Sequence, residues 1–163
     1  MTKKINFQRA NYVITDLERA LKFYRDVLGF KVIFNKDAPE DSYSYDVFDI
    51  KKGTDMGFCV LGTDDEPNCM ALTELREGSL SPVPSPRRAA IVLRVEHFDD
   101  VVAGAQELGL KTYKEDRLET NDGRIGRELG IVDFDGNLVV IYCILSSSYS
   151  VRKKLYGISQ TDI

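Results

Sequence analysis

Few residues of this chain have side chains that could carry out chemistry, and they lie far apart in the sequence. His97 is the single histidine, so a metal site of two histidines and one carboxylate cannot be built within one copy of the chain. The sequence contains no glycine-rich phosphate loop, no HExxH pattern and no Cys-x-x-Cys pair, which disfavours the enzyme classes that depend on them. We interpret His97 as a solvated or helix-capping residue, with a lone metal ligand or a general base as the alternative.

The cysteines follow the same pattern of isolation. Cys59, Cys69 and Cys143 are odd in number and widely spaced, which is typical of reduced thiols in a reducing compartment rather than of a disulfide framework. We interpret them as small buried apolar residues, with a redox or nucleophilic role as the alternative.

The composition is that of an ordinary globular protein. Of 163 residues, 43% are hydrophobic and 29% are charged, and the formal net charge is −4. The negative charge argues against a nucleic-acid-binding protein, which would need a clustered basic face. No apolar run approaches the roughly 20 residues that span a bilayer. Since the first residues also lack the apolar stretch of a signal peptide, we predict a cytoplasmic protein with no membrane partner.

An internal repeat determines the expected architecture. Residues 12–29 and 92–109 each read as a strand end, an amphipathic helix and a terminating Leu-Gly. In the first copy, Thr15 or Asp16 can cap the helix, and Gly29 supplies the left-handed stop. Two copies of one supersecondary unit must share sheets to bury their apolar faces.

The remaining elements follow from hydrophobic periodicity and turn residues. We predict strands at 8–15, 30–34, about 56–62, about 69–76, 89–95 and about 110–115, a final hairpin over 127–142, and helices at about 17–28 and about 98–108. Residues 37–55 form a long connection that contains a short helix or strand, and loops of this length are often functional lids.

These elements group into one predicted domain over residues 1–146, made of two modules at about 6–76 and 88–146. The proline-rich stretch 77–87 is the predicted linker between them. The tail 147–163 either forms a short helix against the body or a partner subunit, or frays.

Two motifs in this order resemble a known family. Asp16-Leu-Glu-Arg-Ala-x-x-Phe-Tyr-x-x-Val-Leu-Gly-Phe30 lies in the first copy, and Asp133-Phe-Asp-Gly-Asn-Leu138 lies in the final hairpin. Around an internal repeat, they closely resemble the glyoxalase/bleomycin-resistance/extradiol-dioxygenase superfamily, the vicinal oxygen chelate proteins, over about residues 8–142. The resemblance implies an α+β fold of two βαβββ modules, whose curved mixed sheets enclose a cavity, usually in a homodimer. Two such modules can close a barrel-like sheet around a pocket and leave the helices outside.

The resemblance also implies where metal ligands would stand. Metal-dependent members place a His on the first strand of a module and a Glu on a late strand, so that the donors converge on a divalent ion. The aligned positions here hold Arg9, Ala90 and Val140, and none of these side chains can donate an electron pair to a cation. The remaining Glu of the pattern falls near Thr73 or Glu74, and their register stays open because a slip of one residue changes the face. We therefore expect a metal-free pocket without a cofactor.

The predicted ligand-binding residues are Arg9, Ala90, Val140, Glu74 and Tyr45. Arg9 could pair with a carboxylate or phosphate of a ligand, and the alternative is an ion pair with Glu74 or with another carboxylate at the rim. Glu74 could instead face solvent. Tyr45 lies on the long connection and could cover the pocket or simply pack.

Together these observations predict a homodimeric protein that binds a small, partly apolar and anionic molecule in a metal-free cavity. No catalytic residue is assigned, and whether the protein is an enzyme stays open. The alternative is a metal-dependent lyase similar to lactoylglutathione lyases, or a ring-cleaving dioxygenase, with atypical ligands such as Glu74, His97 or Glu128. A third possibility is an interaction module whose cavity is filled by its own side chains.

Overall fold

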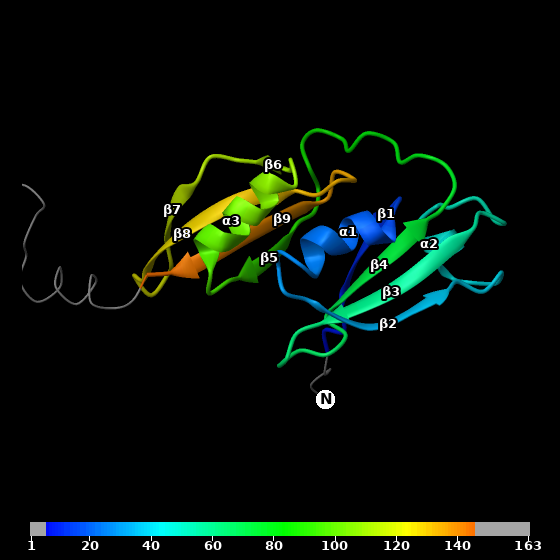
Figure 1. The fold of residues 1–163 in the computed structure, drawn as a ribbon, viewed down its shortest axis with the longest axis horizontal. Helices are drawn as coiled ribbons and strands as arrows, with labels where there is room; N and C mark the ends of the chain where they lie inside the picture. The colour runs from blue at the N-terminus through cyan, green and yellow to red at the C-terminus, as the bar shows by residue number, and fades with distance from the viewer. Residues whose placement is uncertain (1–5, 146–163) are drawn as a thin grey trace, which may run out of the picture. The chain divides into compact units, whose positions relative to one another are not determined.

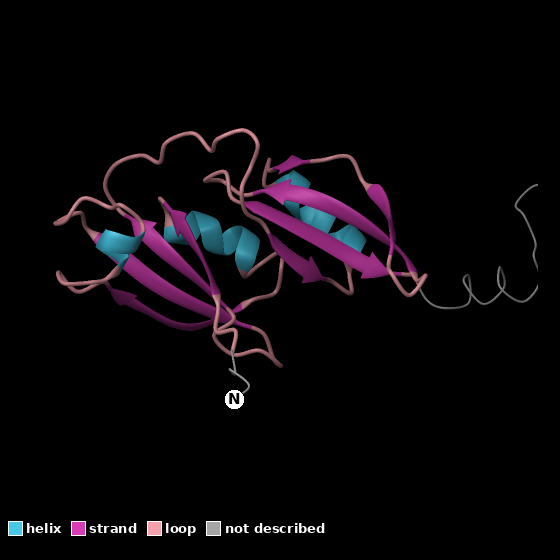
Figure 2. Cartoon of the chain, turned by 180° about the vertical axis from the view of Figure 1, so that it is seen from behind, coloured by secondary structure: helices cyan, strands magenta, loops and turns pink. Residues whose placement is uncertain are grey.

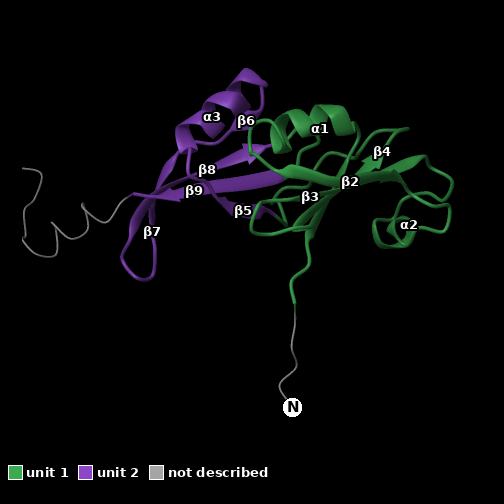
Figure 3. Ribbon diagram, turned by 60° about the horizontal axis from the view of Figure 1, so that its bottom comes forward, with its two compact units in different colours: residues 1–89, 133–137 green, residues 90–132, 138–163 purple. Residues whose placement is uncertain are grey.

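The computed structural model describes residues 6–145, so the predicted tail 147–163 lies outside the described residues. Within them the chain divides into two compact units (Figure 3). Unit 1 comprises residues 6–89 and 133–137, and unit 2 comprises residues 90–132 and 138–145. The turn at 133–137 thus belongs to unit 1, although the strands on either side of it belong to unit 2.

Unit 1 is a four-stranded sheet with a helix against it (Figure 1). Its elements are β1 (Ala10–Ile14), α1 (Leu17–Tyr24), β2 (Lys31–Asp37), α2 (Ser44–Val47), β3 (Met56–Gly62) and β4 (Met70–Leu75). The strand order is β1-β4-β3-β2. Strand β1 runs parallel to β4, and the other neighbours are antiparallel.

Helix α1 forms where the sequence supplies both of its ends. The Asp16 side chain accepts a hydrogen bond from the Arg19 amide at 2.9 Å, and Glu18 lies in the first turn, where the helix dipole favours a negative charge. Gly29 then adopts a φ of 82° beyond the helix end, a conformation that suits glycine. The helix buries an apolar stripe of Leu17, Ala20, Leu21, Phe23 and Tyr24.

Strand pairing assigns each side chain of the unit 1 sheet to one of two faces, because paired residues point to the same side and successive residues alternate. The helix face, against α1, carries Tyr12, Ile14, Cys59, Leu72 and Glu74. The distal face carries Asn11, Phe58, Val60, Ala71 and Thr73. A hydrogen bond of 2.9 Å from Asn11 Nδ2 to Thr73 Oγ1 confirms that these two side chains share the distal face.

Unit 2 repeats the arrangement with more strands (Figures 1 and 2). Its elements are β5 (Ile91–Arg94), α3 (Phe98–Glu107), β6 (Lys111–Thr112), β7 (Asp116–Glu119), β8 (Ile125–Val132) and β9 (Leu138–Ile144). The sheet order is β5-β9-β8-β6, with β7 also paired to β8. Strands β5 and β9 are parallel, as β1 and β4 are in unit 1.

The start of helix α3 is held in a different way from that of α1. His97 at the N-cap makes no side-chain capping bond. Instead, Arg127 on β8 donates to Asp99 in the first turn at 2.8 and 3.2 Å, and its guanidinium lies 4.5 Å from the ring centroid of Phe98. Arg127 also forms two hydrogen bonds with Glu115. These contacts raise the pKa of Arg127 and lower the pKa of Asp99 and Glu115.

The α+β fold with its two repeated modules is confirmed, and two details differ from the expectation. The strand predicted at about 110–115 is only the two-residue β6, and a further strand that was not predicted, β7, follows it; both pair with β8. Among residues 6–145 the sheets stay separate and open rather than closing into one barrel-like sheet. Strand β2 is an edge strand with a register shift between Val32 and Phe34, and such a bulge bends a strand and interrupts further pairing. No helix in the described part of the chain is long and apolar enough to cross a membrane.

Candidate functional site

Arg9 lies on the distal face of unit 1. Its guanidinium stands 5.5 Å from the ring centroid of Phe58, and Phe58 pairs with Thr73 across β3 and β4. Both Arg9 and Phe58 are accessible, whereas Thr73 is buried. Across residues 6–145 Arg9 takes part in no ion pair. This part of the distal face therefore carries a positive charge that the described protein does not neutralise.

Two further residues extend this arrangement along the distal face. The rings of Phe34 and Phe58 lie 6.1 Å apart, and Lys36 Nζ lies 5.9 Å from the Phe34 ring centroid. Arg9, Phe58, Phe34 and Lys36 thus form a group of two cations and two aromatic rings, in which Lys36 is also the partner of Phe58 across β2 and β3. We call this group the cation–aromatic row. Both cations lie within the distance at which a ring face attracts a positive charge.

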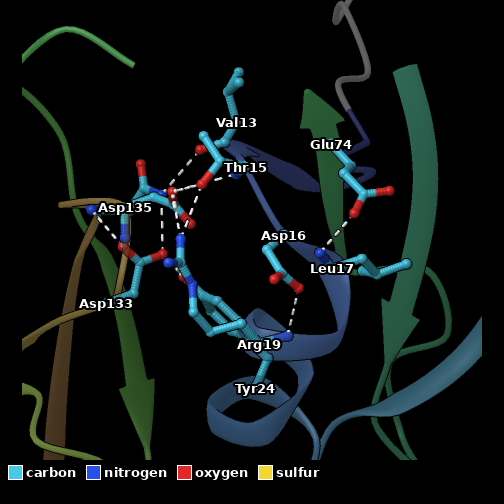
Figure 4. Close-up of polar contacts among 10 residues, drawn as sticks. Val13, Thr15, Asp16, Leu17, Arg19, Tyr24, Glu74, Asp133 and Asp135 are labelled. Atoms are coloured by element: carbon cyan, nitrogen blue, oxygen red, sulfur yellow. Dashed lines mark hydrogen bonds and ion pairs between the residues drawn. The ribbon is translucent and has the colours of Figure 1, made fainter. Parts of the chain in front are cut away.

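Glu74 lies on the other side of the same sheet. Its Oε1 accepts a hydrogen bond from the Leu17 amide at 2.7 Å, at the start of α1 (Figure 4). Its Oε2 accepts a hydrogen bond from Arg76 at 3.1 Å. Arg76 also pairs with Asp37 and Asp55, and these hydrogen bonds raise the pKa of Arg76. The structure thus places Glu74 in contact with the helix start, apart from Arg9.

The register of the two sheets identifies a position that sequence reasoning missed. Alignment of the two strand starts makes Asn11 in β1 equivalent to Val92 in β5. Asn11 pairs with Ala71 of β4, and Val92 pairs with Val140 of β9. Ala71 therefore holds in unit 1 the place that Val140 holds in unit 2.

This finding differs from the expectation that Thr73 or Glu74 stands at that place. Thr73 shares the distal face with Ala71 but lies two residues further along β4. The sequence of β4 alone does not show which of its residues is the counterpart of Val140, because that depends on the register of β4 against β1.

The equivalent face of unit 2 is largely apolar at its first strand. Val92 and Val140 are paired on the face away from α3, and Ala90, one residue before β5, continues the alternation onto the same side. Val92 is 63% exposed and Ala90 is also exposed. Ala90 and Val140 therefore lie on the same side of the unit 2 sheet, with Val92 as the residue paired to Val140.

The other predicted residues have local partners. Tyr45 is only 5% exposed, and its hydroxyl donates to the Thr54 carbonyl at 2.8 Å. The His97 side chain is 80% exposed, with Nδ1 4.0 Å from a carboxylate oxygen of Asp100. Glu128 is half-buried and pairs in register with Tyr142 of β9.

A metal ion requires several donor side chains that lie close together. Across the described residues no group of three or more His, Cys, Asp or Glu side chains is placed to hold one. All three cysteines are free. Burial raises the pKa of the Cys59 thiol to about 11, so this thiol stays protonated and is a poor nucleophile at neutral pH.

The β8–β9 turn forms the most densely hydrogen-bonded cluster of unit 1 (Figure 4). Asp133, which is 6% exposed, accepts hydrogen bonds from the Tyr24 hydroxyl at 2.8 Å and from the amides of Asp135 and Asn137 at 2.9 and 2.7 Å. Burial raises the pKa of both Asp133 and Tyr24. The two sequence motifs therefore meet in space, where they hold the turn against α1.

Comparisons with known proteins identify a family and a relative that are similar to this chain in sequence. The family model described as Glyoxalase/Bleomycin resistance protein/Dioxygenase superfamily matches residues 6–141. A putative lactoylglutathione lyase of Brassica oleracea var. gemmifera is 25% identical over 103 residues, which cover 51% of this chain and 36% of that protein. The aligned part is thus about a third of the length of that relative.

Solved structures share the fold. A glyoxalase family protein from Bacillus cereus superposes with a TM-score of 0.69 at 17% identity, covering 89% of this chain and 97% of that one. Glyoxalase I of Leishmania major superposes with a TM-score of 0.57 at 21% identity, covering 93% of each chain. A fosfomycin resistance protein of Listeria monocytogenes, solved with Mn(II), gives a TM-score of 0.54 at 14% identity, covering 86% and 92%. At these identities the likeness concerns the fold alone.

Proposed function

Since the chain belongs to the Glyoxalase/Bleomycin resistance protein/Dioxygenase superfamily, we propose that it binds a small, partly apolar anion through Arg9 without a metal ion. The observation that supports this most directly is the Arg9 guanidinium lying over Phe58 with no carboxylate partner among the described residues. A guanidinium offers a planar fork of donors that matches a carboxylate or phosphate.

We propose binding without a metal ion because of the residues found at the positions of the family's metal ligands. The resemblance implies that Arg9, Ala90 and Val140 take the places of His and Glu ligands in metal-dependent members, and the strand register makes Ala71 the counterpart of Val140. Alanine and valine have no donor atom, and arginine is a permanent cation that repels a metal ion. These four positions do not fit a divalent cation.

The cation–aromatic row supports the second part of the proposal, that the ligand is partly apolar. Phe34 and Phe58 expose ring surface beside Arg9. Contact with an aromatic or aliphatic group of the ligand would remove this surface from water, while Arg9 would fix the position of the anionic group. Lys36, which is paired with Phe58 across β2 and β3, adds long-range attraction for a negative charge.

A metal-dependent lyase is the second candidate, and the likeness to a protein named as a putative lactoylglutathione lyase favours it. Its atypical ligands would have to come from residues such as Glu74, His97 and Glu128. In the structure Glu74 is already bound to the Leu17 amide and to Arg76. Elemental analysis of the purified protein separates the candidates, because one tightly bound divalent ion per chain would contradict the metal-free proposal.

We further propose that the protein acts as a homodimer in the cytoplasm, as the sequence analysis predicts. Sedimentation of the purified full chain measures the first part of this proposal directly. A monomer at all concentrations tested would contradict it.

The binding proposal is tested with benzoate and benzamide, which have nearly the same shape and differ in charge. We expect benzoate to bind about tenfold or more tightly than benzamide, because only benzoate can form a charge-assisted hydrogen bond with Arg9. Isothermal titration or ligand-observed NMR measures both affinities. Equal affinities, or no binding by either compound, would contradict the proposal.

Matched variants locate the site. Arg9→Ala should remove the preference for benzoate, while Arg25→Ala should keep it. Arg25 is an exposed arginine that pairs with Asp26 beyond the end of α1, so its removal changes the net charge equally without touching the distal face. An equal loss in both variants would show a general charge effect instead of a site.

A further inference from the structure

Unit 1 contains a recess that is separate from the distal face of its sheet. The recess has a volume of about 460 Å³. It lies between the start of α1, the linker segment 78–83 with Arg87, and the β8–β9 turn at 134–136. None of the residues of the cation–aromatic row lines it.

The two guanidinium groups in the recess differ in their partners. Arg19 Nη2 is paired with Asp135 Oδ1 at 3.1 Å and donates to Thr15 Oγ1 at 2.9 Å (Figure 4). Arg87 donates through Nη1 to the Gly136 carbonyl, which is neutral. Arg87 takes part in no ion pair among the described residues. The recess therefore carries one uncompensated positive charge, held in place at half-burial.

Hydroxyl groups stand on the same wall as this charge. Ser79 and Ser81 line the recess, are exposed, and have hydroxyl groups that form no hydrogen bond within residues 6–145. The linker that carries them is seated on the turn, since a Cβ added at Gly136 would lie 2.8 Å from Val83 Cγ2. Gly136 has a φ of 92°, so a glycine there permits both the turn and this close approach.

We propose that this recess binds a phosphate group, either as inorganic phosphate or as part of a small phosphate monoester. Arg87 supplies a fixed positive charge with guanidinium N–H groups left over from its bond to Gly136, and Ser79 and Ser81 supply hydroxyl donors. Asp135 holds the Arg19 side chain in place at the edge of the recess through their ion pair. This site is independent of the ligand site proposed at Arg9.

Titration of the full chain with inorganic phosphate, followed by amide chemical shifts, tests the proposal. We expect saturable shifts at 78–87 and 134–136 in the wild-type protein. Arg87→Ala should weaken phosphate binding about tenfold or more, because it removes the charge-assisted hydrogen bonds. The double variant S79A/S81A should weaken binding by a smaller factor.

The neighbouring Arg88→Ala is the matched control, because Arg88 is exposed and does not line the recess. It should retain wild-type affinity for phosphate, measured from the shifts at 78–87 and 134–136. Unchanged phosphate binding in Arg87→Ala, or equal losses in Arg87→Ala and Arg88→Ala, would overturn the proposal. Because phosphate binding is read out at 78–87 and 134–136, away from Arg9, a failed benzoate test leaves the phosphate result unaffected.

A second titration with glycerol phosphate distinguishes the two sources of the phosphate group. Tighter binding than inorganic phosphate, with further shifts in 78–83, would identify a monoester as the ligand. Weaker binding at the same residues would identify inorganic phosphate. Shifts confined to residues outside the recess would overturn the proposal for either source.

Discussion

The two hairpin turns that occupy equivalent places in the repeat are used in opposite ways. The β3–β4 turn closes on itself, with the Thr63 amide donating to the Glu66 carbonyl and the Glu66 amide donating to Thr63 Oγ1, both at 3.0 Å. The β8–β9 turn is built around the buried Asp133, and Asn137 Nδ2 reaches the Val13 carbonyl at 3.2 Å. One turn is therefore a local connection, while the other is part of the structure of unit 1.

This difference shows how a duplicated unit can become asymmetric. Asp133 and Tyr24 are separated by 109 residues in the chain and form a hydrogen bond in the core of unit 1. Because burial makes a polar group costly unless it is paired, the second turn can be changed only together with its partners. The first turn has only local hydrogen bonds and an exposed ion pair between Lys31 and Asp64, so it can change at a lower cost.

The largest expected effect comes from the buried turn. Asp133→Ala should lower the free energy of unfolding by about 3 kcal/mol, because the Tyr24 hydroxyl and two amide groups lose their acceptor. Denaturant unfolding followed by circular dichroism measures this change.

The matched variant in the other turn is Thr63→Ala. It should cost no more than about 1 kcal/mol, because a single hydrogen bond in an exposed turn is lost. Equal costs in the two turns would contradict the comparison.

The pH dependence of stability also tests whether the contact between Tyr24 and Asp133 is buried in the folded protein. Burial, with the charge and hydrogen bond of Asp133, raises the pKa of Tyr24 well above its ordinary value of 10.0. Above that pH the unfolded chain loses the tyrosine proton while the folded chain keeps it, so the unfolded state is favoured as pH rises. This one group should reduce stability by about 1.4 kcal/mol per pH unit above its unfolded pKa.

Tyr24→Phe should therefore show a shallower decrease in stability above pH 10 than the wild-type protein. Tyr43→Phe, which removes a hydroxyl from a side chain that is 74% exposed, is the control. Urea unfolding across the alkaline range measures the slopes. A wild-type slope in Tyr24→Phe would disprove the assignment.

The two helix starts give a third comparison. Asp16→Ala should cost about 1 kcal/mol, since the Arg19 amide at the start of α1 loses its acceptor. His97→Asp should have the opposite sign and add up to about 1 kcal/mol, because the N-cap of α3 has no side-chain bond. A loss of stability in His97→Asp would show that Arg127 already compensates for the missing cap.

The smallest effect on stability is expected at the start of β1. Arg9→Ala should change the free energy of unfolding by no more than about 0.5 kcal/mol, because Arg9 is exposed and forms no ion pair among residues 6–145. Thermal unfolding measures this change. A drop of several degrees would assign Arg9 a structural role and weaken the case for a ligand anchor.

Sequence alone determined the features that depend on neighbouring residues. The repeat, a helix cap at Thr15 or Asp16 and the Gly29 stop follow from local spacing, and the strand predicted at about 56–62 is β3 with the same bounds. The structure assigns the cap to Asp16. The family also followed from sequence, because its two motifs are contiguous and stand in a fixed order.

Tertiary structure decided which side chains share a face. Pairing between strands that are distant in the chain makes Ala71 the counterpart of Val140 and places Glu74 beside α1. It also brings together the residues of the cation–aromatic row. Strand alternation in the sequence fixes two sides but does not say which side meets the helix. Only the hydrogen-bonded register between β1 and β4 supplies that information.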